Sequence, residues 1–358
     1  MRSVVLFPWV ALAAAFSSVF PPIVAARVAF FVFGDSLVDA GNNNYLGGFK
    51  INRFPYGETF FGRPTGRVCD GRIYPDFIAE YAKLPLIKPC LEPNFSDYSD
   101  GANFASAGAG VLPGTRPGTL HLALQVSYFE KVTERLTQQK GDEGAQKLIS
   151  DAVYHIGMGG NDYMGLERSS LSTNTTFSSQ DKKAFVRMVL GNLTGCVEKL
   201  YRLGGRKFSF QNVGPIGCMP STRFDMKIDG CWHETTVLAK KHNTELARLL
   251  AELATRLPGF KYSLFDYNTA LLNRIMNSTR YGFKYGKSAC CGSGAYNGNF
   301  TCGSQNGYYN LCSNPSEYVF FDGGHPTEST NRQLAALMWR GKPAVTGPHD
   351  LRTLFEHP

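Results

Sequence analysis

The chain has 358 residues, of which 43% are hydrophobic and 18% are charged, and its formal net charge is +8. This apolar content can form a sizeable core, so general disorder is excluded. The basic residues are scattered or paired, as at Lys240-Lys241, and form no long tract. That distribution argues against nucleic acid as a partner.

The N-terminus has the pattern of a secretory signal peptide. Arg2 is followed by an apolar stretch from Val4 to Phe20 and by the small residues Val24-Ala25-Ala26. This order predicts a signal peptide over residues 1–26. No later stretch has the roughly 20 continuous apolar residues of a membrane helix, so stable membrane insertion is not expected. We expect a secreted, extracellular protein.

Cysteines and glycosylation sequons agree with that compartment. Of nine cysteines, the last four lie in a Gly/Asn/Ser-rich segment over 288–313, namely Cys290, Cys291, Cys302 and Cys312. Disulfides are expected to hold this segment, with connectivity open and at least one thiol left over. Zinc-ligand spacing is missing, so no metal is expected. N-glycosylation is predicted at five sequons: Asn94, Asn174, Asn192, Asn277 and Asn299.

Strand and helix patterns alternate along the rest of the chain. Short runs rich in β-formers cover 28–33, 151–157, 206–213 and 261–266, and apolar residues at helical spacing cover 126–136, 185–200 and 237–253. This alternation predicts an α/β fold with a parallel sheet covered on both faces. No linker or repeat interrupts it, so residues 27–358 are expected to form a single domain. Sites in such sheets lie at the carboxyl ends of strands.

Ser36 follows the first predicted strand, in the sequence Phe33-Gly34-Asp35-Ser36. A serine at a strand-to-helix turn can hold its hydroxyl clear of the sheet and leave its backbone N–H free as a donor. Most serines in this position only cap a helix. Ser36 is therefore a candidate nucleophile that needs a partner elsewhere in the chain.

That partner is predicted near the C-terminus, where Asp322 lies three residues before His325. On a tight turn this spacing lets the carboxylate accept from one ring nitrogen, so that the other can deprotonate a serine. No other histidine has an acidic residue three positions earlier. His155 lies inside a predicted strand and is interpreted as a core residue.

Two glycine-rich stretches offer donors for an oxyanion. Residues 101–110 are small enough to let backbone N–H groups approach a substrate, and Asn161 follows the strand predicted at 151–157. Either stretch alone could be an ordinary turn. Neither is a phosphate-binding loop, and the chain has no G-x-S-x-G elbow.

These blocks, in this order, resemble the SGNH/GDSL hydrolases, and specifically the plant-type GDSL esterase/lipase family. The likeness covers nearly the whole mature chain and includes the segments Pro64–Arg72 and Pro75–Tyr81. It implies a three-layer α/β/α sandwich with a central parallel sheet, flavodoxin-like, with no metal or organic cofactor and broad ester acceptance.

The resemblance also implies roles for single residues. Ser36, Asp322 and His325 correspond to the catalytic triad, and Ser36, Gly108 and Asn161 to the oxyanion hole, with Gly110 as the alternative to Gly108. Members often carry Trp before the triad Asp, whereas this chain has Phe321. That departure keeps an aromatic ring and loses an indole N–H.

The sequence, together with this resemblance, therefore predicts a secreted serine esterase or lipase that cleaves carboxylic esters through an acyl-enzyme. The plant-type resemblance implies the apoplast or cell wall as its location, where a positive net charge fits work near acidic wall polymers. An acyltransferase with the same triad and a non-catalytic, defence-associated protein on this scaffold are the alternatives. The substrate is a small or polymer-linked ester, and acylglycerols, polysaccharide acetyl groups and phenolic esters all stay open. The oligomeric state is also open.

Overall fold

A twisted sheet forms the centre of the molecule, with strand order β10-β5-β4-β3-β1-β2. The structure is a computed structural model that describes residues 3, 27–48, 50–305 and 307–356, so the predicted signal peptide lies almost wholly outside the described residues. The strands are β1 (Phe30–Gly34), β2 (Gly101–Asn103), β3 (Val153–Gly157), β4 (Lys207–Gln211), β5 (Lys261–Phe265) and β10 (Thr346–Pro348). β1 to β5 pair in parallel, and β10 joins β5 antiparallel.

The order 2-1-3-4-5 of the parallel strands is that of flavodoxin-like doubly wound folds, which confirms the predicted fold class. Four predicted strands match β1, β3, β4 and β5 to within about two residues. Two strands were not predicted. β2 is only three residues long and has no β-branched side chain, and β10 adds an antiparallel edge that the strand–helix alternation does not indicate.

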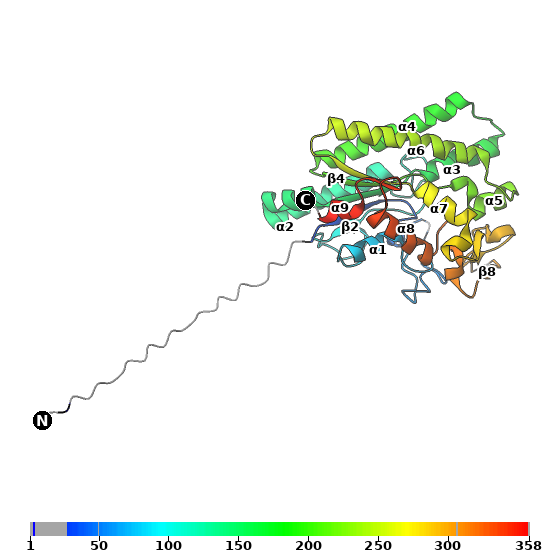
Figure 1. Ribbon diagram of the computed structural model, residues 1–358, viewed down its shortest axis with the longest axis horizontal. Coiled ribbons are helices and arrows are strands. Elements are labelled where there is room, and N and C mark those ends of the chain that lie inside the picture. The colour runs from blue at the N-terminus through cyan, green and yellow to red at the C-terminus, as the bar shows by residue number, and fades with distance from the viewer. Residues whose placement is uncertain (1–2, 4–26, 49, 306, 357–358) are drawn as a thin grey trace.

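Helices cover both faces of the sheet (Figure 1). On one side α2 (Leu122–Asp151), α4 (Ser179–Arg202), α6 (His233–Arg256) and α3 (Gly160–Thr173) pack on one another. On the other side lie α1 (Tyr74–Tyr81), α7 (Tyr267–Met276), α8 (Glu328–Arg340) and α9 (Leu351–Glu356). This gives the three layers of the predicted sandwich. The short α5 (Pro220–Met226) lies beyond the sheet edge, next to α3 in the view of Figure 1.

The core forms because β1 is apolar on both faces. Phe31 and Phe33 lie fully buried, where the Phe33 ring stacks on Phe104 at 4.9 Å and the Phe31 ring meets Phe129 edge-on at 4.9 Å. Phe30 faces the other layer and meets Phe355 of α9 at 5.5 Å. A strand buried on both sides needs continuous apolar residues, which is the pattern that predicted it.

Disulfides hold the irregular region between β5 and α8. Cys290 pairs with Cys312 and Cys291 with Cys302, beside the small pairings β6 (Tyr285–Ala289) with β9 (Tyr318–Phe320) and β7 (Cys291–Gly292) with β8 (Asn310–Leu311). The predicted use of these four cysteines is confirmed. A third bridge joins Cys218 to Cys231, and Cys69, Cys90 and Cys196 are free thiols.

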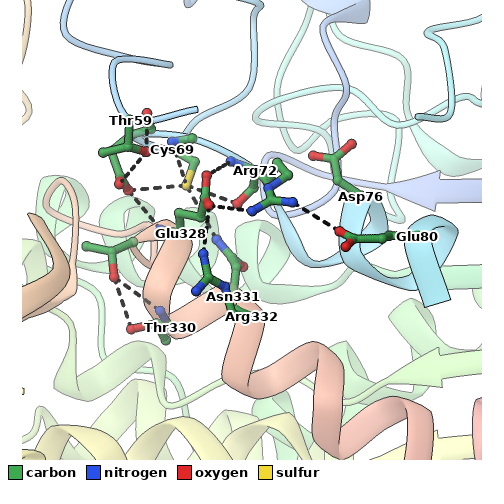
Figure 2. A network of polar contacts seen from close by, with 12 residues as sticks. Thr59, Cys69, Arg72, Asp76, Glu80, Glu328, Thr330, Asn331 and Arg332 are labelled. Carbon is green, nitrogen blue, oxygen red and sulfur yellow. Dashed lines mark hydrogen bonds and ion pairs between the residues drawn. The ribbon is translucent and has the colours of Figure 1, made fainter. Parts of the chain in front are cut away.

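A network of polar contacts fixes the start of α8, as Figure 2 shows. Glu328 accepts from the Arg72 guanidinium at 2.9 Å and from the Arg72 backbone N–H at 2.8 Å, while the Glu328 N–H donates to Asp70 at 2.8 Å. The Arg72 guanidinium also lies between the rings of Phe60 and Phe77, at 4.0 and 4.4 Å. The family-like segment 64–72 therefore anchors the helix that follows His325.

Candidate active site

Ser36 lies on a turn just beyond β1, as its sequence predicted. Gly34 permits the close approach of β1 to β3, because a Cβ at that position would lie 2.4 Å from the carbonyl oxygen of Gly157. The Asp35 carboxylate then accepts the backbone N–H of Leu37 at 3.0 Å and the Asp35 carbonyl accepts from Asp39 at 3.0 Å, which closes the turn around Ser36. Its hydroxyl projects past the carboxyl end of the strand.

The C-terminal turn brings Asp322 and His325 to that hydroxyl. Asp322 Oδ1 accepts the backbone N–H groups of Gly324 and His325, both at 2.9 Å, and it lies 2.6 Å from His325 Nδ1. His325 Nε2 lies 2.7 Å from Ser36 Oγ, across 289 residues of chain. With Nδ1–H donating to the carboxylate, Nε2 is left to accept from the serine hydroxyl.

Electrostatics within this chain favour a charged carboxylate and a basic imidazole. Burial raises the pKa of Asp322, but the charge and hydrogen bond of His325 and the N–H of Gly324 outweigh it, so this pKa lies below 3.8. Burial lowers the pKa of His325, but Asp322 and then Asp35 outweigh it, so this pKa lies above 6.5. The imidazole is therefore basic enough to accept a serine proton. In mild acid it is already protonated and can no longer act as a base.

Unpaired backbone donors lie beside Ser36. Among the described residues, neither the Ser36 N–H nor the Gly108 N–H donates to a protein acceptor. Gly108 has φ +87°, a conformation that favours glycine, and it lines the same cavity as Ser36 and Asn161. Gly110 lies away from the lining, since a Cβ there would meet the side chains of Thr115 and Asp162.

Asn161 lies in the first turn of α3 with its amide directed at the glycine segment. One Nδ2 hydrogen donates to the Ala109 carbonyl at 2.9 Å, which leaves the other for a ligand in the cavity. Asp162, the next residue, accepts the N–H groups of Val111 and Leu112 at 2.9 and 3.0 Å. α3 and the glycine segment are thus held in one fixed relation.

Asp39 and its neighbours were missed as positioning groups by the sequence reasoning. Asp39 Oδ2 accepts the N–H of Ala107 at 2.9 Å, and Asn43 donates to the Ala107 carbonyl at 2.9 Å. Asn42 donates to the Ala105 carbonyl at 2.8 Å. These contacts place Gly108 beside Ser36. Their signal in the sequence was the polar run 39–44 immediately after the serine turn, which had no assigned partner.

The cavity at Ser36 has a volume of about 390 Å³ and is lined by both apolar and charged side chains. Four apolar residues, which we call the apolar flank, come from α3 and from segment 219–226: Met164, Leu171, Met219 and Met226. The same two elements contribute Glu167, Arg168 and Asp225, and Arg53 and Arg116 also line the cavity. The Phe300 ring lies 6.2 Å from the His325 ring, so the disulfide-held loop forms part of the wall.

The remaining predictions fall outside the cavity. His155 is fully buried between the Tyr74 hydroxyl at 2.7 Å and Ser209 at 3.1 Å, in agreement with its interpretation as a core residue. His242, for which no partner was foreseen, is buried against the Tyr163 hydroxyl at 2.6 Å. The five sequon asparagines are exposed: Asn94, Asn174, Asn192, Asn277 and Asn299. In the described residues no three His, Cys, Asp or Glu side chains gather as metal ligands.

A flavodoxin-like sheet with a serine, a histidine and a carboxylate at its carboxyl edge defines a hydrolase of the SGNH type. The chain belongs to the GDSL-like lipase/acylhydrolase family, whose pattern it matches over residues 30–338. This confirms the resemblance found in the sequence, and the chain is a carboxylic ester hydrolase by that membership.

Curated relatives cover almost the same length. The chain is 47% identical to GDSL esterase/lipase 4 of Arabidopsis thaliana, over 92% of this chain and 90% of the relative. It is 45% identical to a GDSL lipase of Tanacetum cinerariifolium, over 92% and 88% of the two chains. An Arabidopsis protein named as an inactive GDSL esterase/lipase-like protein is 39% identical, over 94% of this chain and 76% of its own.

Proposed function

We propose that the protein is a secreted serine esterase that hydrolyses carboxylic esters through an acyl-enzyme. The observation that carries this proposal is the continuous chain from Asp322 through His325 to Ser36, with contacts of 2.6 and 2.7 Å. A serine hydroxyl this close to a neutral imidazole nitrogen can be deprotonated as it attacks a carbonyl carbon.

The reaction follows from that geometry in two halves. Ser36 Oγ attacks the ester carbonyl while its proton passes to His325 Nε2, and Asp322 stabilises the imidazolium. The carbonyl oxygen takes the negative charge and is held by the N–H groups of Ser36 and Gly108 and by the Asn161 amide. Collapse breaks the ester C–O bond, and His325 returns the proton to the leaving alcohol. Water, activated by the same histidine, then releases the acid and restores Ser36.

The apolar flank of the cavity supports aliphatic acyl groups longer than acetyl. Met164 and Leu171 line the cavity from α3, together with Glu167 and Arg168, and Met219 and Met226 line it from segment 219–226. Methionine side chains adapt to ligands of different length. Each methylene buried there should add about 0.8 kcal/mol of binding, or about fourfold in kcat/KM, until the flank is filled.

One substitution distinguishes an esterase from the alternative, a non-catalytic protein on the same fold. Ser36→Ala should lower the turnover of p-nitrophenyl butyrate by more than about a thousandfold. Ser127→Ala is the matched control and should retain wild-type activity, because Ser127 is a half-buried residue of α2 whose hydroxyl bonds only the Ala123 carbonyl. Turnover in the Ser36 variant comparable to that of wild type would refute the assignment.

Hydrolysis and acyl transfer are separated by their products. In water with added butanol, the proposal predicts free butyric acid as the main product from p-nitrophenyl butyrate, because water is the proposed acceptor of the acyl group. Butyl butyrate in excess over the acid would instead make the protein an acyltransferase. Ser36→Ala abolishes both products if the triad is correctly assigned.

Secretion is proposed together with a single hydrolase domain over residues 27–358. Three disulfides and five exposed sequons support an oxidising, glycosylating compartment. Within the described residues every helix is too short or too polar to cross a bilayer. Expression of the full chain in plant cells should give an extracellular protein that begins at Arg27 and loses mass on treatment with an N-glycosidase. An intracellular, uncleaved product would contradict this part of the proposal.

A further inference from the structure

A tyrosine far from the other site residues in sequence donates to the Asp322 carboxylate. Tyr56 Oη lies 2.8 Å from Asp322 Oδ2, and the two residues are separated by 266 positions in the chain. Both are almost completely buried, with 2% and 1% of their surface exposed. Because Asp322 Oδ1 already accepts from His325 and two backbone N–H groups, Tyr56 is the partner of the second carboxylate oxygen.

The ring of Tyr56 is fixed by packing as well as by this hydrogen bond. It meets the Phe321 ring edge-on, with the centroids 5.3 Å apart, in a small buried cluster that also contains Ile51 and Val68. The residue that precedes the carboxylate thus holds the tyrosine that binds the carboxylate. A phenolic hydroxyl in such a position can do more than fill space, since it bonds the group that sets the basicity of the histidine.

We propose that Tyr56 is a positioning residue that extends the chain Ser36–His325–Asp322 by one hydrogen bond and moderates the basicity of His325. This inference rests on the proposed function, because it assigns a role within that triad. In this role Tyr56 acts on the reaction through Asp322, and its side chain also lines the cavity at Ser36.

The donor role holds at every working pH. Burial and the negative charge of Asp322 raise the pKa of Tyr56 well above its usual value of 10, although the charge of Arg53 lowers it in part. The hydroxyl therefore keeps its proton and donates it to the carboxylate. Hydrogen bonds spread the negative charge of a carboxylate. A carboxylate that accepts at both oxygens therefore stabilises the imidazolium less than one that accepts at a single oxygen.

Removal of the hydroxyl should consequently make His325 more basic. Asp35 adds to the basicity of His325, and Arg53 lowers the pKa of Tyr56. The other charged groups that line the cavity are Arg116, Glu167, Arg168 and Asp225. The negative charges of Asp162 and Asp39 raise the pKa of Asp35. All of these stay in place in a tyrosine-to-phenylalanine variant, so a change in the pH profile would report the lost hydrogen bond.

The test compares the dependence of kcat/KM on pH for wild type and Tyr56→Phe with p-nitrophenyl butyrate. The variant keeps the ring that packs on Phe321. We expect its acidic limb, which reports the His325 pKa, to move upward by about half a pH unit, and kcat at the plateau to fall severalfold. Tyr154→Phe is the matched control: it removes a buried hydroxyl that donates to the Ile149 carbonyl at 2.7 Å and should leave the limb in place.

Replacement of Tyr56 by 3-fluorotyrosine provides a second variant of almost unchanged shape, in case the phenylalanine variant folds poorly. The fluorinated phenol is the stronger donor, so the acidic limb should move downward. Opposite displacements in the two variants would support the inference. An unchanged limb in both, or a lower kcat without any displacement, would leave Tyr56 a packing residue and overturn it. Because Ser36→Ala tests the triad separately, loss of activity there with a wild-type profile in Tyr56→Phe would refute only this inference.

Discussion

Asp35 provides a sharp test of the electrostatics at the site, because it carries a buried carboxyl next to Ser36. Only 5% of its surface is exposed, and one backbone N–H, from Leu37 at 3.0 Å, donates to it. Burial raises its pKa from 3.8 to about 7, while the Leu37 N–H and the charge of His325 hold it from rising further. Asp35→Asn keeps the shape and the acceptor oxygen and removes the charge.

The magnitude follows from the raised pKa. The stabilising contribution of a carboxyl whose folded pKa is raised is fully present below the unfolded value, here 3.8, and is lost as the pH rises through about 7. At about 1.4 kcal/mol for each pKa unit, the ionised group costs up to about 4 kcal/mol above neutrality. We expect Asp35→Asn to gain about 2 kcal/mol at pH 8.5, since burying the new amide offsets part of the benefit.

Urea unfolding at pH 4.5 and pH 8.5 measures this effect, with intrinsic fluorescence as the signal. The unfolding free energy should rise clearly at pH 8.5 and should be unchanged or slightly lower at pH 4.5, where the wild-type carboxyl is mostly protonated and the cost of the buried amide remains. Asp181→Asn is a control of opposite sign, because the Ser178 side chain and N–H lower the pKa of Asp181, so that variant should lose stability at pH 8.5. Equal or lower stability of Asp35→Asn at pH 8.5 would refute the reasoning. Asp35 also raises the pKa of His325, so the acidic limb of the activity profile should move to lower pH in Asp35→Asn.

Further predictions concern the triad, the disulfide-held loop and the cavity flank. Asp322→Asn should lower kcat by about 10⁴-fold, because the amide favours the wrong imidazole tautomer. Steady-state kinetics with butyrate esters measures this loss, and a loss below tenfold would contradict the prediction. The double variant Cys291→Ala, Cys302→Ala should lose about 2–3 kcal/mol of unfolding free energy in urea, because it removes a disulfide. Its kcat should also fall, because the loop places Phe300 against His325. Unchanged stability and rate would contradict this prediction. Met164→Phe should reduce kcat/KM for octanoate esters about tenfold and spare acetate esters; a uniform loss across chain lengths would count against the acyl flank.

The parts of the fold that sequence predicted are those set by local patterns. The continuous apolar run ending at Phe33 predicted a doubly buried strand, and the structure contains it as β1. The spacing of Asp322 and His325 predicted a contact that needs only one turn, and that contact is 2.6 Å. Contacts between residues far apart in the chain were harder to predict from the sequence. The four C-terminal cysteines could be predicted to form bridges, but only the fold decides which pairs form.

Residues whose role depends on packing against distant segments could not be assigned from the sequence, even where a polar run was visible, as at Asp39. Tyr56 lies in a loop without a recognised motif, and its contact with Asp322 exists only because the sheet brings two ends of the chain together. Asp162 and Asp39 likewise bind backbone N–H groups that lie more than 50 residues away. Such contacts require coordinates, whereas the serine turn and the Asp–His turn were visible as short motifs.

The central claim is that Ser36 carries the acyl group during turnover. Brief incubation with p-nitrophenyl butyrate, acid quenching and peptide mass spectrometry measures it directly. The account predicts one butyryl group on the peptide that contains Ser36, at increased occupancy in a variant with slowed deacylation, and no such adduct in Ser36→Ala. Ester hydrolysis with no adduct on Ser36, or with an adduct on another residue, would contradict the account.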